Sequence, residues 1–151
     1  MVEVYNNQQV VEISDLLLEQ WAAGANLALP LCMKNPAHDG GVLADLAIVE
    51  VSIVDDATID QVHRDFMNIP GATDVITFAH GEIVVSSETA RFNASEYGNS
   101  FENELMLYMI HGLLHLAGHE DALAIERDFM EKLQDEILKQ VCVMIVKRCQ
   151  W

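Results

Sequence analysis

The sequence has few positive charges for its length. Its 151 residues include only eight lysines and arginines against 24 aspartates and glutamates, which gives a formal net charge of −16. Proteins that bind nucleic acid generally do so through many cations that neutralise phosphates. The composition therefore argues against general nucleic-acid binding. Such a ligand would be recognised locally, through a few cations such as Lys34, Arg64 and Arg91, or would be presented to the protein by a partner.

Cysteines and long apolar runs are also scarce. Cys32, Cys142 and Cys149 form an odd set without C-x-x-C spacing, which argues against a disulfide framework and favours reduced thiols in the cytoplasm. The N-terminus lacks the basic region and apolar run of a signal peptide. The apolar stretch at 105–118 is interrupted by two histidines and is too short to span a bilayer. We therefore expect a soluble, cytoplasmic protein with no membrane partner.

No internal repeat, low-complexity tract or linker divides the chain, so we expect one domain over residues 1–151. A chain of this length, with 51% hydrophobic residues, buries on the order of 70% of its unfolded surface. Its mixture of helix and strand patterns predicts an α+β (α/β-like) fold, in which helices flank a small mixed β-sheet of about four strands.

Local patterns predict the order of these elements. Apolar residues at helical spacing predict helices at 13–29, after Asp55, from Ser87, at 102–117 and after Asp121, which is expected to cap the last helix. Apolar runs predict strands at 2–5, 42–54, 73–79 and 82–86, the last two joined by a tight His80-Gly81 turn. Residues 30–41 are expected to form a loop, and 141–146 either continue the last helix or pair as a short strand.

Three of these helices have a predicted apolar face, which on the first helix consists of Leu17, Trp21, Ala25 and Leu29. On the short helix after Asp55, the side chains expected to point inward are Ile59, Val62 and Phe66. On the last helix, the apolar residues that recur near the helical period are Leu123, Ile125, Phe129, Leu133 and Ile137.

Three of the six histidines fall within residues 111–121, which read H-G-L-L-H-L-A-G-H-E-D. His111 and His115 lie one turn apart on one face of a helix, so both can bind a single Zn²⁺. A helix that continued to His119 would carry this residue about 12 Å from His111, too far for ligand bonds of about 2.0–2.1 Å. The helix is therefore expected to end at Gly118, because glycine adopts the left-handed conformation that ends helices.

After that turn, either His119 or Asp121 can reach the metal as its third ligand. Asp121 is the expected ligand, and helix capping is the competing role of its carboxylate. His119 is the alternative ligand; otherwise it supports another ligand or is exposed. If both residues bound the metal, four protein ligands would close the site and make it structural rather than catalytic.

The pattern H-x-x-x-H-x-x-G-x-x-D is similar to the H-E-x-x-H-x-x-G-x-x-H motif of metzincin proteases, with aspartate in the last position. In those enzymes the glutamate is the general base that acts on the metal-bound water. This chain has Gly112 at that position, and glycine cannot act as a base. A peptidase activity is therefore disfavoured.

Residues 111–118 resemble more closely the signature of the YbeY family, which reads roughly H-G-x-L-H-L-x-G-Y-D-H. Residues 73–78, T-D-V-I-T-F, are similar to its T-D-V-L-S-F segment, and 81–85, G-E-I-V-V, to the strand G-D-I-V-I that follows. The resemblance spans about residues 45–130. The family consists of bacterial single-domain metalloproteins that are associated with ribosomal RNA maturation and described as endoribonucleases. The resemblance implies a small sheet covered by helices, with a metal site in a cleft at one side.

The chain departs from the family pattern at three places. The terminal histidine of the signature aligns with Asp121 and its tyrosine with His119; a carboxylate lowers the charge of the metal centre by one unit, so we expect a less acidified metal-bound water. The family arginine six residues before T-D-V aligns with Met67, and Arg64, one helical turn away, is a candidate to replace it. The link at 79–81 is shorter than the insert that the family often has.

The resemblance implies a zinc-dependent endoribonuclease in ribosomal RNA processing, with one Zn²⁺ held by His111, His115 and Asp121 and hydrolysis assisted by a zinc-bound water. Its expected partner is RNA, as ribosomal RNA or within a ribosomal particle. Other divalent metals also suit these ligands. The acidity, the missing protease-type glutamate and the missing family arginine favour an alternative, a non-catalytic, metal-stabilised maturation factor that binds a ribosomal protein or GTPase. A third candidate is a metal-dependent hydrolase of another substrate.

Overall fold

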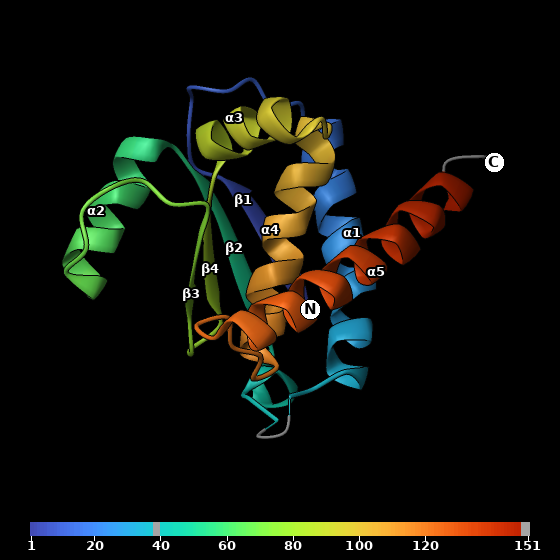
Figure 1. Ribbon diagram of the computed structural model, residues 1–151. Helices are drawn as coiled ribbons and strands as arrows, with labels where there is room; N and C mark the ends of the chain where they lie inside the picture. Colours follow the sequence, from blue (N-terminus) through green and yellow to red (C-terminus); the bar gives the residue numbers. More distant parts are fainter. Residues whose placement is uncertain (38–39, 149–151) are drawn as a thin grey trace.

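A computed structural model describes residues 1–37 and 40–148 of the chain (Figure 1). In this part, five α-helices and four strands follow one another in the predicted order. The helices are α1 (Asp15–Lys34), α2 (Asp56–Met67), α3 (Ser87–Tyr97), α4 (Phe101–Leu116) and α5 (Ala124–Arg148). The strands are β1 (Val2–Asn6), β2 (Val49–Val54), β3 (Val75–Phe78) and β4 (Glu82–Ser86).

The four strands form one mixed sheet in the order β1-β2-β4-β3. β1, β2 and β4 are parallel, and β3 runs antiparallel to β4, so the predicted hairpin and the predicted N-terminal strand are both confirmed. Gly81 in the hairpin turn has a φ of +104°, which glycine adopts without strain. β3 lies at the edge of the sheet, with β4 on one side only.

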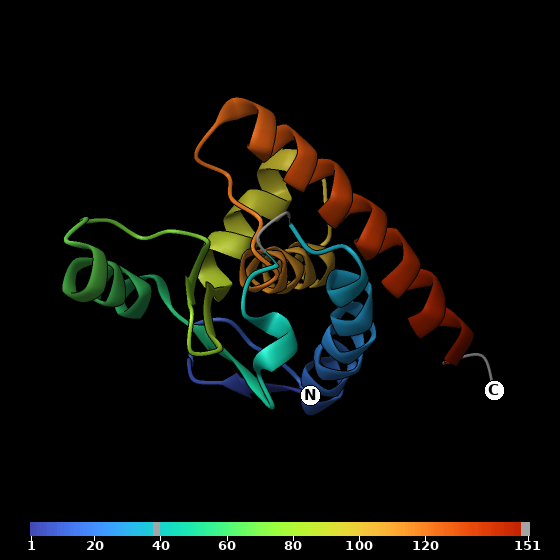
Figure 2. The ribbon, with the colours of Figure 1, turned by 90° about the horizontal axis from the view of Figure 1, so that it is seen from below.

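The sheet carries a hydrophobic core on each face, because side chains alternate between the two faces along a strand. One face packs against the helical layer in a large core that includes Val51, Ile83 and Leu113. The other face packs against α2 in a small cluster built around Ile59 and Ile76. Figure 2 shows α2 alone on one side of the sheet, with α1, α4 and α5 on the other. The α+β architecture predicted from the sequence is confirmed.

Four helices begin at a side chain that accepts a backbone N–H three residues ahead. These N-caps are Ser14, Asp55, Ser86 and Ser100. Such a cap supplies a partner for one of the N–H groups that a helix leaves free at its start. The starts of α1, α2, α3 and α4 lie within two residues of the predicted positions, since capping depends on neighbouring residues alone.

The chain between α1 and β2 differs from its prediction. α1 continues through Pro30 to Lys34 instead of ending at 29, because the buried residues Ala28 and Cys32 hold it against the core, and tertiary packing outweighs the local cost of proline. The predicted strand at 42–54 begins only at Val49. Residues 43–45 instead form a 3₁₀ turn, because Val42 is already hydrogen-bonded to the end of α4.

Two predicted apolar faces were partly wrong. Phe66 on α2 is 70% exposed, although Ile59 is buried as expected. For the last helix, Ile137 is buried and Leu133 packs against the core as expected, but Leu123, Ile125 and Phe129 are exposed, because α5 begins at Ala124, beyond Asp121, and turns a partly different stripe inward. That buried stripe consists of Met130, Gln134, Ile137 and Val141. Residues 141–146 continue α5, one of the two predicted alternatives.

In the described part of the chain, none of the helices combines the length and apolar character that crossing a membrane requires.

Candidate metal centre

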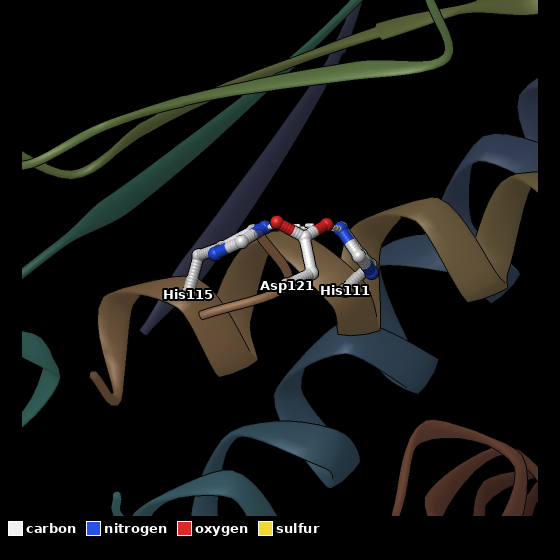
Figure 3. A group of neighbouring side chains, drawn as sticks. All are labelled: His111, His115 and Asp121. Carbon is white, nitrogen blue, oxygen red and sulfur yellow. Dashed lines mark hydrogen bonds and ion pairs between the residues drawn. The ribbon is translucent and has the colours of Figure 1, made fainter. Parts of the chain in front are cut away.

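His111 and His115 lie on one face of α4 and point toward each other, with their Nε2 atoms 3.0 Å apart (Figure 3). Asp121 arrives from beyond the end of the helix. Its Oδ2 atom lies 3.3 Å from Nε2 of His111 and 3.6 Å from Nε2 of His115. The three side chains that the sequence singled out are therefore brought together at one point.

The end of α4 turns the chain back toward these histidines. Gly118 has a φ of +98°, and its N–H donates to the carbonyl of His115 while the N–H of His119 donates to that of Leu114. This pair of bonds is the Schellman arrangement that glycine makes possible at a helix end. The predicted termination at Gly118 is confirmed, and it places Asp121 beside the two rings.

A distant segment fixes this helix end in place. The N–H groups of Ala37 and Val42 donate to the carbonyls of Ala117 and Leu116. Gly41 lies so close that a Cβ atom there would collide with the backbone of residues 116–118. We call these backbone contacts of Ala37, Gly41 and Val42 with the end of α4 the clasp. The clasp joins the chain after α1 to the turn that carries Asp121.

Hydrogen bonds at Nδ1 orient both rings. Nδ1 of His115 lies 2.9 Å from the backbone carbonyl of His119, and Nδ1 of His111 lies 2.9 Å from Oε1 of Gln134 on α5. Both partners are acceptors, so each Nδ1 carries the proton and each Nε2 presents a lone pair. Gln134 is buried. Sequence reasoning missed this residue, and its only signal was a polar side chain within the stripe that α5 buries.

This arrangement fits a divalent cation. Two imidazole lone pairs and a carboxylate oxygen face one another at 3.0–3.6 Å, and with both Nδ1 atoms protonated they repel each other unless a cation lies between them. Tetrahedral ligands at about 2.0–2.1 Å from zinc lie about 3.3 Å from one another, close to these separations. The cluster of His111, His115 and Asp121 could hold a metal ion.

The charge state of His115 also suits a metal site. Burial lowers the pKa of this imidazole below its ordinary value, and the neighbouring His111 lowers it further, while Asp121 opposes both effects. A lowered pKa means that the ring is neutral at pH 7. Only a neutral imidazole can coordinate a metal, so no proton has to be removed from His115 at neutral pH.

His119, the alternative third ligand, points elsewhere. Its Nε2 atom lies 2.6 Å from the carbonyl of Asn35, and its ring stacks on Phe129 at 5.8 Å between centroids. Only its backbone carbonyl reaches the cluster, through His115. The prediction that Asp121 caps the last helix is wrong, because α5 begins three residues further on, at Ala124.

The cluster opens into a cleft of about 950 Å³ between α4, α5 and the edge strand β3. Arg127 is the only lysine or arginine among the described residues that line it, and its Nε atom donates to the backbone carbonyl of Asp121. Five carboxylates line the same cleft: Asp74, Glu104, Glu120, Asp121 and Glu131. Arg64, expected as a substitute cation, is instead paired with Asp60 at 3.0 Å and lies outside the cleft lining.

Gly112 has a packing role next to the cluster. A Cβ atom at this position would lie 2.7–3.0 Å from side-chain atoms of Ile83 on β4, so α4 approaches the sheet too closely for any larger residue. A protease-type glutamate could not be accommodated here without moving the helix away from the sheet. This supports the sequence argument against a peptidase.

Comparison with known proteins agrees with this site and fold. The family model described as Endoribonuclease YbeY matches residues 4–142. Endoribonuclease YbeY of Helicobacter pylori (strain ATCC 700392 / 26695) is 34% identical over 144 residues, covering 90% of this chain and 86% of the relative. Endoribonuclease YbeY of Rhodopirellula baltica is 40% identical over 107 residues, covering 64% of this chain and 55% of the relative.

The fold matches a solved structure over nearly the whole chain. The solution structure of the Thermotoga maritima protein TM1509 aligns with a TM-score of 0.66 and 26% sequence identity, covering 98% of this chain and 93% of that one. The family match, the identity with the Helicobacter protein and the shared fold agree with the resemblance seen in the histidine motif. The chain belongs to the YbeY endoribonuclease family.

Proposed function

We propose that the protein is a zinc-dependent endoribonuclease of ribosomal RNA processing, in which His111, His115 and Asp121 hold one zinc ion. The observation that carries this proposal is the meeting of two oriented imidazoles and a carboxylate at the wall of a cleft. Family membership supports RNA as the substrate, because the relatives are named endoribonucleases. The cytoplasm, expected from the scarce cysteines, is the proposed location.

The residues at this site have different roles in binding the metal. Zinc, once bound, would act as a Lewis acid on a phosphoryl oxygen and lower the pKa of an attacking water. His111 and His115 supply neutral ligands whose rings are fixed at Nδ1 by Gln134 and the carbonyl of His119. Asp121 supplies a negative charge, so the metal centre is one unit less positive than one with three histidines.

A second function is favoured by the charge of the cleft. Among the described residues, five carboxylates and a single guanidinium line it, and a polyanionic RNA gains little from such a surface. This favours the alternative of a metal-stabilised maturation factor without catalytic activity, which binds a ribosomal protein or GTPase. Measurement of RNA cleavage by the purified protein separates the two functions.

Removal and return of zinc tests the proposed reaction. We expect the chelator-treated protein to lose cleavage of a single-stranded ribosomal RNA fragment and to regain it with one equivalent of zinc. Saturation at about 100 times the Kd should also stabilise the fold by about 2.7 kcal/mol. For a chain of this size that raises Tm by roughly 5–10 °C. Cleavage that is unchanged in the metal-free protein would contradict the proposal.

Matched aspartate variants locate the metal in the same assay. Asp121→Asn should lose zinc and cleavage, because it removes the negative charge that balances the cation. Asp135→Asn is the control, since Asp135 is exposed on α5 and outside the cleft lining. If the two variants bind zinc equally well, Asp121 is not a ligand.

Gln134→Ala should weaken zinc binding by about 10- to 100-fold, the usual effect of removing a partner that orients a metal-binding histidine. The reason is that Nδ1 of His111 loses the acceptor that fixes its ring. Gln134→Glu keeps an acceptor at the same place and should retain most of the affinity. Gln140→Ala, at an exposed position of the same helix, is the control in a competition titration with a zinc chelator. Equal affinities of Gln134→Ala and wild type would show that this hydrogen bond does not matter.

A further inference from the structure

Three aromatic rings follow one another on the α2 side of the sheet. The ring centroids of Phe66 and Phe78 are 5.3 Å apart, and those of Phe78 and His80 are 5.5 Å apart. Phe66 is 70% exposed, and the His80 side chain is 68% exposed. We call these three residues the aromatic ridge. It joins the end of α2 to the hairpin turn of β3 and β4.

The hydrophobic core covers this ridge only in part: Phe78 is half-buried and packs against the small cluster beneath α2, whereas Phe66 and His80 are exposed. α2 packs on its face of the sheet through a small cluster, and Figure 2 shows this helix projecting away from the rest of the molecule. The end of the helix and the residues after it also expose Met67 and Ile69, at 43% and 50%. Exposed apolar residues that gather in one place mark a binding surface more often than scattered ones do.

Residues next to the ridge line the cleft of the metal centre. Met67, next to Phe66 on α2, lines the cleft. Thr77 lines it as well, on the face of β3 opposite Phe78 because side chains alternate along a strand, and so does Ala79 in the hairpin turn. β3 is the edge strand, so a bound chain can pass from the ridge over this edge toward His111 and His115 without meeting another strand.

The charge of the cleft determines what kind of contact can hold an RNA strand there. The described lining of the cleft contains one guanidinium and five carboxylates, so neutralisation of RNA phosphates contributes little to the affinity. Unpaired bases stack on exposed aromatic rings of any kind, which contributes affinity without phosphate contacts. Double-stranded RNA does not offer free base faces to such a surface.

We propose that Phe66, Phe78 and His80 form a stacking surface for unpaired bases of an RNA strand whose backbone enters the metal cleft. This inference rests on the proposed endoribonuclease function, and it assigns the base contacts of that substrate to a surface outside the metal centre. Because stacking is not screened by ions, binding at this surface depends less on salt than binding through phosphates does.

The test is binding of fluorescein-labelled, unstructured oligonucleotides to the zinc-loaded full chain, followed by fluorescence anisotropy. Phe66→Ala should weaken binding about fivefold or more, the loss expected for one stacked base. It should raise KM for RNA cleavage and leave kcat unchanged, since Phe66 is not among the residues that line the metal cleft. Phe66→Leu keeps the apolar bulk but removes the ring, and it should bind as weakly as Phe66→Ala.

Phe92→Ala is the matched control, because Phe92 is 65% exposed on α3 and lies outside the cleft lining. It should bind RNA within twofold of wild type. An abasic oligonucleotide provides a second control: it should bind wild type and Phe66→Ala equally weakly, because it has no bases to stack. An equal loss of RNA affinity in Phe66→Ala and Phe92→Ala would overturn the inference.

Failure of this inference can be told apart from failure of the proposed function. If wild type cleaves RNA and Phe66→Ala binds and cleaves it equally well, the ridge is not a base-binding surface, and an apolar protein partner becomes its better occupant. If Phe66→Ala loses base-dependent binding but wild type does not cleave RNA with zinc, the ridge is supported and the endonuclease proposal fails.

Discussion

His111→Ala should lose its zinc, and its rate of RNA cleavage should fall at least 100-fold. This loss is larger than the usual 10- to 100-fold effect of removing a hydrogen-bond partner of a metal ligand. His115 and Asp121 would remain as two ligands, too few to hold zinc in a tetrahedral site. Elemental analysis of the purified variant and cleavage of a ribosomal RNA fragment at saturating substrate measure both effects.

The same substitution should leave the metal-free fold intact. The His111 side chain is 21% exposed, and its removal relieves the repulsion between two facing Nε2 lone pairs. The buried Oε1 atom of Gln134 loses its donor, so we expect the metal-free variant to be folded but about 1–3 kcal/mol less stable than metal-free wild type. Zinc should then stabilise wild type but not His111→Ala.

His63→Ala provides the control for His111→Ala. His63 lies on α2, and its Nδ1 atom contacts the carbonyl of Gly71 rather than the metal cluster. This variant should keep one equivalent of zinc and the zinc-dependent rise in Tm. A full equivalent of tightly bound zinc in His111→Ala would rule out the ligand set proposed here.

The parts of the site that could be predicted are those fixed by neighbouring residues. The spacing of His111 and His115 determines that both rings share a helix face, and Gly118 determines where that helix ends. The choice between His119 and Asp121 was left open by the sequence because it depends on distant residues. Asn35 and Phe129 hold the His119 ring away from the cluster.

Gln134 was missed for a related reason. Its role depends on how α5 is rotated against α4, and the apolar residues Ile125 and Phe129 suggested a different inward face. The rotation places Gln134 within 2.9 Å of His111 and leaves Phe129 to stack on His119. A helix with apolar residues on more than one face does not reveal its orientation until its neighbours are known.

The fold shows the same division between local and distant causes. Helix starts were predicted because a cap such as Ser100 acts on the N–H of a residue three positions ahead. Pro30 was expected to end α1, since proline lacks the N–H that a helix interior uses. Burial of Ala28 and Cys32 keeps the helix intact past Pro30, and no residue close in sequence indicates that burial.

Gly41→Ala should be among the most destabilising single substitutions in this chain, with a loss of about 3 kcal/mol or more in free energy of unfolding. Two costs add up. Gly41 has a φ of +60°, which costs a residue with a Cβ atom about 1–2 kcal/mol. The added methyl group would also collide with the Leu116 carbonyl and the backbone of Gly118, and these atoms belong to the clasp and cannot move aside cheaply.

Gly98→Ala separates the two costs. Gly98 has a similar φ of +71°, but a Cβ atom there would meet nothing within 4 Å. It should lose only the backbone part, about 1–2 kcal/mol, and lower Tm by a few degrees. Gly41→Ala should lower Tm by roughly 10 °C. Urea unfolding of both metal-free variants measures the difference, and equal losses would show that the clasp yields to the methyl group.

The effect of Gly41→Ala should extend to the metal. Asp121 reaches His111 and His115 only because the chain turns at Gly118, and Gly41 lies against that turn. Displacing the turn moves the carboxylate relative to the two rings, so zinc affinity should fall in Gly41→Ala at temperatures where the protein is still folded. Gly98→Ala, which lies at the end of α3, should bind zinc as wild type does. Unchanged zinc affinity in a folded but destabilised Gly41→Ala would mean that the clasp supports the fold without positioning Asp121.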